Sequence, residues 1–260
     1  MKEFNTIATE YNGQVVTLWL ARPEVHNALD DIMIRELSSF FTEIEENSEI
    51  RLVVVRGKGR SFCSGADLNW MKRAFSLTEE ENLRESKELS TLFKLIYDSN
   101  KIVIAAVHGN VFGGGNGIVA ACDLAYCIDN AKFSLSETRI GMAAASITPY
   151  MLKKVHVADL KAFIFSAMSF NGKDAVKYGL LNKSFPSSEF MELYLNSIVS
   201  EILANGRLAL IESKRLINSL SDQSMSLEMP QIPELLARIR VSAEAQEGFS
   251  AFLEKRNPRW

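Results

Sequence analysis

The stretch KIVIAAVHGNVFGGGNGIVAACD, from Lys101 to Asp123, decides the fold of this chain. Its first part is apolar and β-branched, which is typical of a strand buried on both faces. The chain then passes Gly109 and a turn with glycine at positions 113, 114, 115 and 117, before apolar residues of helical character resume. We therefore expect a strand, a glycine-rich turn and a helix. Such a turn lets another group approach the backbone closely, and amides at the start of a helix attract negative charge.

Three uses of this turn compete. The glycines can simply let a helix pack tightly on a sheet. The run from 115 to 120 also fits the dinucleotide pattern G-x-G-x-x-A, but that fingerprint should follow its strand directly in an opening βαβ unit. The absence of a following Lys-Ser/Thr pair excludes a P-loop. The third use is an oxyanion hole, which needs a second amide donor.

Composition narrows the class of protein. The chain has 260 residues, enough for one large domain or for one domain plus an extension. With 32 acidic and 29 basic residues, and a net charge of −3, it lacks the electrostatic signature of a nucleic-acid-binding protein. The three cysteines have no paired spacing, which favours reduced thiols. No signal-like or membrane-length apolar stretch occurs, so we expect a soluble, cytoplasmic protein.

The first quarter predicts strand, strand, helix, strand. Asn12-Gly13 is a hairpin signal between strands at 6–11 and 14–20. Apolar residues at helical spacing predict an amphipathic helix from Asp30 to about Asn47. The short run at 52–55 is β-branched and predicts a buried strand. This order indicates a right-handed parallel crossover.

A second glycine-bearing turn, GKGRSFCSGADLNWM at 57–71, follows that strand directly. Ligands of open α/β folds gather at the carboxyl ends of the strands, and both turns leave such ends. If the amides of Ala66 and Gly114 face one crevice, they supply two donors for one developing oxyanion. Asp67 also fits a plain helix N-cap, and both interpretations can hold together.

Among the carboxylates, Glu137 stands out because it lies in a short polar turn, 136–141, between apolar segments. Most glutamates lie at the surface, so the residue type alone favours a solvated side chain. Further along, Asn171-Gly172 predicts the end of a helix, Asn205-Gly206 predicts the end of another, and the last helices begin near Glu234. The isolated histidines His26, His108 and His156 give no metal-ligand spacing, so we expect no metal.

Six blocks of sequence together resemble the crotonase superfamily, that of enoyl-CoA hydratases and isomerases. They are HNALD at 26–30, SFCSGADL at 61–68, IAAVHGNVFGGGNG at 104–117, ACDLAYC at 121–127, AKFSLSETRIG at 131–141 and EGFSAFLEKRNP at 247–258. The resemblance implies an α/β crotonase-like fold. Its spiral core of repeated ββα units would span residues 1–200, and a C-terminal helical region, 201–260, would complete the CoA site and the oligomer. It also implies homotrimers that pair into hexamers, and no cofactor beyond the CoA of the substrate.

The same resemblance implies the site residues. The carbonyl oxygen of an acyl-CoA thioester would be held by the amides of Ala66 and Gly114. The remaining contacts with substrate or CoA would come from Glu24, Val25, Ser64, Asp67, Leu68, Gly113, Phe252 and Lys255, with Ala66 and Gly114 contributing again. The acyl pocket would be built by residues 70–95 and 142–152.

One departure from the family pattern bears on the reaction. Family hydratases usually carry two glutamates; here Gly117 stands at the first position and Glu137 at the second. The segments FGGGNGIVAACD and FSLSETRIGMAAASITPYML are similar to bacterial methylglutaconyl-CoA hydratases, in which glycine also stands at the first position. We therefore expect hydration of a branched enoyl-CoA, with Glu137 moving the water proton and Asn116 or backbone groups holding the water. A Δ3,Δ2-enoyl-CoA isomerase with one glutamate is the alternative. An RNA-binding homologue is a further one, which the balanced charge disfavours.

Overall fold

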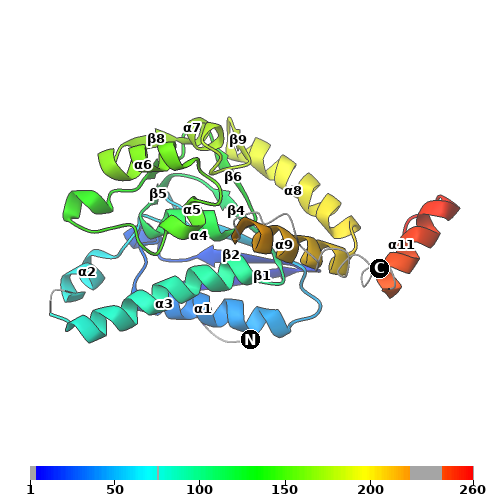
Figure 1. Cartoon of the computed structure of the whole chain (residues 1–260), viewed down its shortest axis with the longest axis horizontal. Helices are drawn as coiled ribbons and strands as arrows, with labels where there is room; N and C mark the ends of the chain where they lie inside the picture. Colours follow the sequence, from blue (N-terminus) through cyan, green and yellow to red (C-terminus); the bar gives the residue numbers. More distant parts are fainter. Residues whose placement is uncertain (1–3, 75, 223–241, 260) are drawn as a thin grey trace. The chain divides into compact units, whose positions relative to one another are not determined.

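The computed structural model describes residues 4–74, 76–222 and 242–259 (Figure 1). The chain divides into two compact units, Met1–Leu195 and Asn196–Trp260. The first unit holds a six-stranded sheet with the order β1 (Ile7–Asn12), β2 (Val15–Leu20), β3 (Leu52–Gly57), β4 (Ile102–Val107), β6 (Leu124–Ile128) and β9 (Lys183–Phe185). Strands β1 and β2 pair antiparallel, and each later pair in this order is parallel. The predicted α/β class is thereby confirmed.

The local signals of the first quarter form the elements they predict. Gly13 closes the β1–β2 hairpin at a φ of +56°, a conformation that glycine adopts without strain. Helix α1 (Asp31–Glu46) begins at the Asp30 cap, whose carboxylate accepts a hydrogen bond from Met33 N at 2.8 Å. Strands β3 and β4 pair in register from Leu52↔Ile102 and are almost wholly buried. A strand buried on both faces needs such a continuous apolar run.

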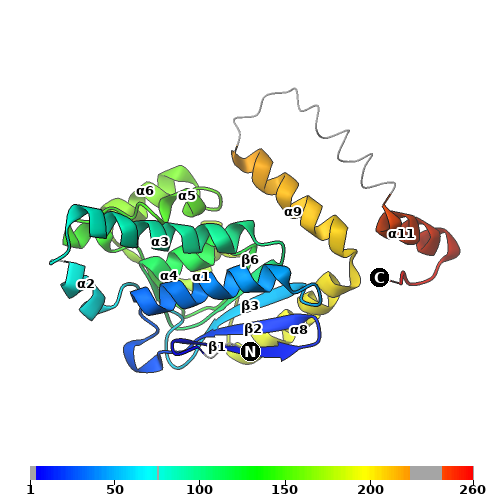
Figure 2. The ribbon, with the colours of Figure 1, turned by 90° about the horizontal axis from the view of Figure 1, so that it is seen from below.

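A capping box opens α3 (Glu79–Asp98), where Thr78 and Glu81 exchange hydrogen bonds. Helices α1 and α3 pack against each other beside the sheet, as both views show (Figures 1 and 2). The apolar stripe of α3 is buried at Leu92, Phe93 and Ile96. The same stripe reaches the glycine-rich helix α4 (Gly114–Ala121).

A second, three-stranded sheet was not predicted in full. Its order is β5 (Asn110–Phe112), β7 (Lys132–Ser134) and β8 (Ser169–Asn171), with β5–β7 parallel and β7–β8 antiparallel. Strand β5 interrupts the expected connection, so the chain runs from β4 through β5 before α4 begins. Three residues are too few to show a periodic pattern, which is why the sequence does not reveal β5 or β8.

The prediction that Asn171-Gly172 ends a helix was wrong. Helix α6 (Val157–Ser166) ends before β8, at Ala167 with a φ of +50°. Asn171 is instead the N-cap of α7 (Gly172–Lys177), and its side chain accepts a hydrogen bond from Asp174 N at 3.0 Å. An Asn-Gly pair fits both a helix end and a helix start, and here the aspartate at the third helical position makes it a start. The remaining short elements of the first unit are η1 (Pro23–Val25), α2 (Leu68–Ala74), η2 (Glu137–Ile140) and α5 (Thr148–Met151).

Helix α8 (Ser188–Ala204) starts in the first unit, where Glu192 accepts two hydrogen bonds from Arg56 of β3, at 2.5 and 2.7 Å. It ends before Asn205-Gly206, as predicted. The second unit contains α9 (Arg207–Asp222) and α11 (Ala243–Glu254). Glu244 of α11 accepts hydrogen bonds from the amides of Leu208 and Ala209 at 2.9 Å and so caps α9. The predicted start near Glu234 lies outside the described residues. None of the described helices has the length and hydropathy needed to cross a membrane.

Candidate active site

The segment from Phe62 to Asp67 joins two parts of the first unit and brings the two glycine-bearing turns together. On one side, Cys63 N donates to Asn110 O at 3.1 Å, and Phe112 N donates to Cys63 O at 2.9 Å. On the other side, Leu29 N donates to Gly65 O at 2.7 Å, and Asp67 N donates to Leu29 O at 2.8 Å. The segment therefore behaves as an extra extended strand between β5 and the start of α1.

Close contact between glycines brings Ala66 near the start of α4. A Cβ on Gly113 would lie 3.5 Å from Gly65 Cα, and a Cβ on Gly65 would lie 3.2 Å from Phe112 O. Gly113 has φ +46° and ψ −122°, which only glycine adopts readily. Ala66 and Gly114 directly follow the two touching glycines. Within the described residues, the amides of Ala66 and Gly114 donate to no protein oxygen. Both N–H groups are thus available to an oxygen of a bound molecule.

Glu137 lies at this same point. It opens η2, three residues after the last residue of β7, and its Oε1 lies 3.3 Å from where a Cβ on Gly113 would be. Its Oε2 is buried and has no hydrogen-bond partner among the described residues. Burial raises the pKa of this carboxyl, and a hydrogen bond from its own amide only partly opposes that effect. A carboxylate that has a raised pKa and one oxygen without a partner is suited to accepting and returning a proton.

Gly117 faces an aromatic ring. A Cβ at this position would lie 2.4 Å from Cζ of Phe93 and 2.8 Å from both of its Cε atoms. Phe93 comes from α3, is fully buried, and contacts Tyr150 edge-on with ring centroids 6.1 Å apart. A carboxylate side chain at 117 has no room while this ring stays in place. Of the carboxylates beside the glycine turns in the described chain, Asp67 is bonded to Arg22, and Glu137 is the one with an oxygen that has no partner.

Asn116, which is predicted to help hold a water, bonds to the protein backbone through its side-chain nitrogen. It is fully buried, and its Nδ2 donates to Ser134 O at 2.9 Å and to Val111 O at 3.1 Å, with Gly113 O at 3.4 Å. Its Oδ1 is buried without a partner among the described residues. The amide nitrogen is therefore already occupied by backbone carbonyls.

Asp67 has the N-cap geometry that was one of its two interpretations. Its Oδ1 accepts from the amides of Asn69 at 2.8 Å and Trp70 at 3.3 Å, and its Oδ2 accepts from Arg22 at 3.0 Å. Burial alone would raise its pKa, but these hydrogen bonds and the Arg22 charge lower it. Arg22 also pairs with Asp30 at 3.0 Å and donates to Ala28 O at 2.8 Å. Sequence reasoning missed this arginine, which lies just after β2 and directly before Pro23.

The other predicted contact residues lie in several places. Val25, in η1, accepts a 3.4 Å hydrogen bond from Ser64 Oγ, so these two are brought together, and Glu24 beside them is exposed. Leu68 is 73% exposed at the start of α2. Lys255 is exposed in the second unit, and the side chain of Phe252 lies outside the described part of the structure.

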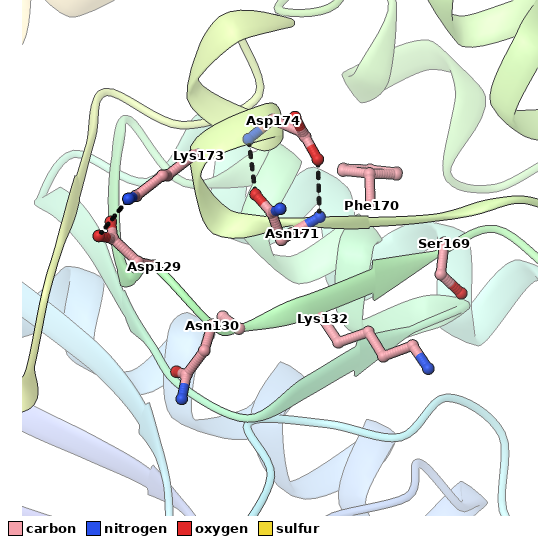
Figure 3. Close-up of a pocket in the computed structure, with 9 residues that line it drawn as sticks. Asp129, Asn130, Lys132, Ser169, Phe170, Asn171, Lys173 and Asp174 are labelled. Carbon is pink, nitrogen blue, oxygen red and sulfur yellow. Dashed lines mark hydrogen bonds and ion pairs between the residues drawn. The ribbon is translucent and has the colours of Figure 1, made fainter.

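A surface depression of about 600 Å³ lies elsewhere, between β7, β8 and α7 (Figure 3). None of the predicted site residues lines it. Two interactions lie along its lining: Lys173 pairs with Asp129 at 3.2 Å, and Asn171 and Asp174 form the capping box of α7. Across the described residues, no cluster of three or more histidine, cysteine, aspartate and glutamate side chains suits a metal ion.

Comparison with known proteins gives a consistent result. Residues 10–260 match the family described as enoyl-CoA hydratase/isomerase. The short-chain-enoyl-CoA hydratase of Clostridium acetobutylicum is 30% identical, covering 98% of this chain and 97% of that protein. The mitochondrial Delta(3,5)-Delta(2,4)-dienoyl-CoA isomerase of Dictyostelium discoideum is 28% identical over 94% of this chain and 86% of its own. The crystal structure of an enoyl-CoA hydratase from Shewanella pealeana superposes with a TM-score of 0.95 at 29% identity, covering 99% and 97% of the two chains.

Proposed function

Because the chain belongs to the enoyl-CoA hydratase/isomerase family, we propose that it adds water across the 2,3 double bond of an enoyl-CoA thioester. The observation that carries this proposal is the Glu137 carboxylate, which lies beside two free amides and whose buried Oε2 has no partner among the described residues. The name of the Clostridium relative, a short-chain-enoyl-CoA hydratase, supports hydration, and the name of the Dictyostelium relative, a dienoyl-CoA isomerase, supports the second candidate given below. For the acyl group we propose a branched one, such as 3-methylglutaconyl-CoA, on the local sequence similarity described above.

The reaction follows from the charges that each group handles. The thioester carbonyl accepts hydrogen bonds from Ala66 N–H and Gly114 N–H, which stabilise the negative charge that its oxygen gains as an enolate forms. Glu137 takes a proton from water while the water oxygen bonds to C3 of the substrate. The protonated Glu137 then returns that proton to C2, which collapses the enolate and restores the carboxylate. Water has been added, and the enzyme is unchanged.

Double-bond migration is the second candidate, and the Phe93 ring at Gly117 favours it. With one carboxylate, Glu137 would remove a proton from C2 of a 3-enoyl-CoA and deliver it to C4, giving the 2-enoyl-CoA. The same two amides would hold the enolate. This reaction needs no bound water, and therefore no second group to position one.

One experiment separates the two reactions. The purified protein is incubated in H₂¹⁸O with 3-methylglutaconyl-CoA, crotonyl-CoA and a 3-enoyl-CoA, and the products are resolved by mass spectrometry. Hydration predicts ¹⁸O-labelled 3-hydroxyacyl-CoA, with the branched substrate turned over fastest. Double-bond migration without incorporation of ¹⁸O would contradict hydration and establish the isomerase. Salt-dependent binding of AU-rich RNA without any turnover would contradict both.

The assembly and location that we propose rest on the sequence resemblance. A homotrimer, or a hexamer made of two trimers, predicts a mass of three or six times 29.1 kDa in light scattering. A monomer would contradict it. A cytoplasmic location remains a prediction from the sequence.

A further inference from the structure

Asn116 makes the hydrogen bonds that link the two halves of the site. Its Nδ2 donates to Val111 O of β5 at 3.1 Å and to Ser134 O of β7 at 2.9 Å. The first half of the site, Gly113-Gly114, lies between Val111 and Asn116 in the chain. The second half, Glu137, follows Ser134 by three residues. A single side chain therefore contacts both backbone segments that position the chemistry.

Other contacts at this point are weak on their own. Strands β5 and β7 pair over three residues, Asn110↔Lys132 to Phe112↔Ser134. Beyond Phe112 the pairing continues with one long hydrogen bond, from Gly113 N to Ser134 O at 3.2 Å. Gly113 itself has an unusual backbone conformation and no side chain to fix it. The carbonyl of Ser134 thus accepts from both the glycine turn and Asn116, and the Asn116 bond is the shorter of the two.

The burial of Asn116 gives these bonds their strength. The side chain has no exposed surface, so water cannot replace a lost partner of the carbonyls at Val111 and Ser134 without entering the core. A residue needed only for packing at this position would be apolar, because a buried amide with one unpartnered oxygen is costly. The presence of an asparagine here indicates that the two donated hydrogen bonds matter.

We infer that Asn116 is a positioning residue, which holds the Gly114 amide and the Glu137 carboxylate at a fixed separation by bonding the backbone of β5 to that of β7. This inference rests on the proposed function of the two groups it positions. It assigns Asn116 no contact with substrate or with water. Displacements of about 1 Å between reacting groups cost about 10²-fold in rate, so a loosened link affects turnover more than binding.

The test uses Asn116→Ala, Asn116→Ser and a control, Ile44→Ala. Ile44 is buried near the end of α1. The chain runs from this end of α1 to the amino end of β3, whereas the site lies beyond the carboxyl ends of the strands. The Ile44→Ala variant therefore loses core packing but no contact with the site. For each variant, kcat is measured with whichever enoyl-CoA the wild type converts, and Kd is measured with the saturated butyryl-CoA. Hydrogen exchange of peptides covering 110–117 and 132–138 is followed by mass spectrometry.

We expect Asn116→Ala to lower kcat by about 10²-fold with Kd changed by less than about threefold. The serine variant, whose hydroxyl can donate to one of the two carbonyls, should recover part of kcat, and Ile44→Ala should keep it. Both peptides should exchange faster in Asn116→Ala than in Ile44→Ala. Wild-type kcat in Asn116→Ala, or equal losses in the alanine variant and the control, would overturn the inference. If the wild type converts no acyl-CoA, the proposed function fails. The inference about Asn116 is overturned separately if hydrogen exchange of both peptides is the same in Asn116→Ala as in the wild type.

Discussion

Replacing Gly117 with alanine should destabilise the protein, although alanine normally favours a helix. The new methyl carbon would lie 2.4, 2.8 and 2.8 Å from three atoms of the buried Phe93 ring, where carbon atoms prefer about 3.5–4.0 Å. Overpacking of this kind costs about 1–3 kcal/mol, and an overlap of this size with three atoms points to the upper end. Alanine gains about 1 kcal/mol over glycine in a helix. The net expected loss is about 2 kcal/mol.

A double-mutant cycle isolates the cause. In a Phe93→Leu background the distal ring atoms are gone, so Gly117→Ala should stabilise that variant by up to about 1 kcal/mol. The two substitutions then couple by about 3 kcal/mol, measured as differences in the free energy of unfolding in urea. Stabilisation of the wild type by Gly117→Ala, or additive effects in the double variant, would refute the account. The cycle bears on function because the same ring excludes a glutamate at 117 and leaves Glu137 to act alone.

Two further predictions concern charged groups. The acidic limb of kcat/KM against pH should have its midpoint above the ordinary glutamate pKa of 4.5, because burial raises the pKa of Glu137 and its charged form is the base. A measured midpoint at or below 4.5 would contradict the assignment of Glu137 as the base. Asp67→Ala should lower the free energy of unfolding by about 1–3 kcal/mol at pH 7, because it removes the cap of α2 and leaves Arg22 without one of its two carboxylate partners. The contribution of Asp67 to the free energy of unfolding should decrease as the pH falls below the unfolded-state pKa of 3.8, because the folded-state pKa of Asp67 is lower still. If Asp67→Ala lowers the free energy of unfolding equally at every pH, packing and not charge is responsible.

Much of the fold was predictable because its signals are local. The apolar runs of β3 and β4 are too short and too β-branched for helices, and adjacent parallel strands deliver their exits to one edge of a sheet. These two facts of sequence predict that the turns at Ala66 and Gly114 meet at one crevice, but the sequence does not reveal β5, which lies between β4 and the Gly114 turn. The polar turn around Glu137 is likewise visible as a local departure from apolar sequence.

The rest depends on contacts between distant residues. The Phe93 ring lies against Gly117 only because α3 packs on α4, and nothing in either segment identifies the other as its partner. The sequence does not reveal the partners of Asn116 at Val111 and Ser134, because they belong to a sheet whose strands have three residues each. Asn171-Gly172 shows a different limit, since one dipeptide serves as a helix end or a helix start according to its neighbours.

The central claim is that Glu137 alone moves the proton, and Glu137→Gln tests it most directly. The substitution keeps the size of the side chain and removes the base, so turnover of enoyl-CoA should fall by about 10²–10⁴-fold. The Kd for butyryl-CoA should stay within a few-fold, and the melting temperature should not fall, because the charge that is removed is half-buried and its Oε2 has no partner among the described residues. The control Glu49→Gln, exposed just before β3, should retain full activity. Turnover of Glu137→Gln within about tenfold of the wild type would contradict the claim.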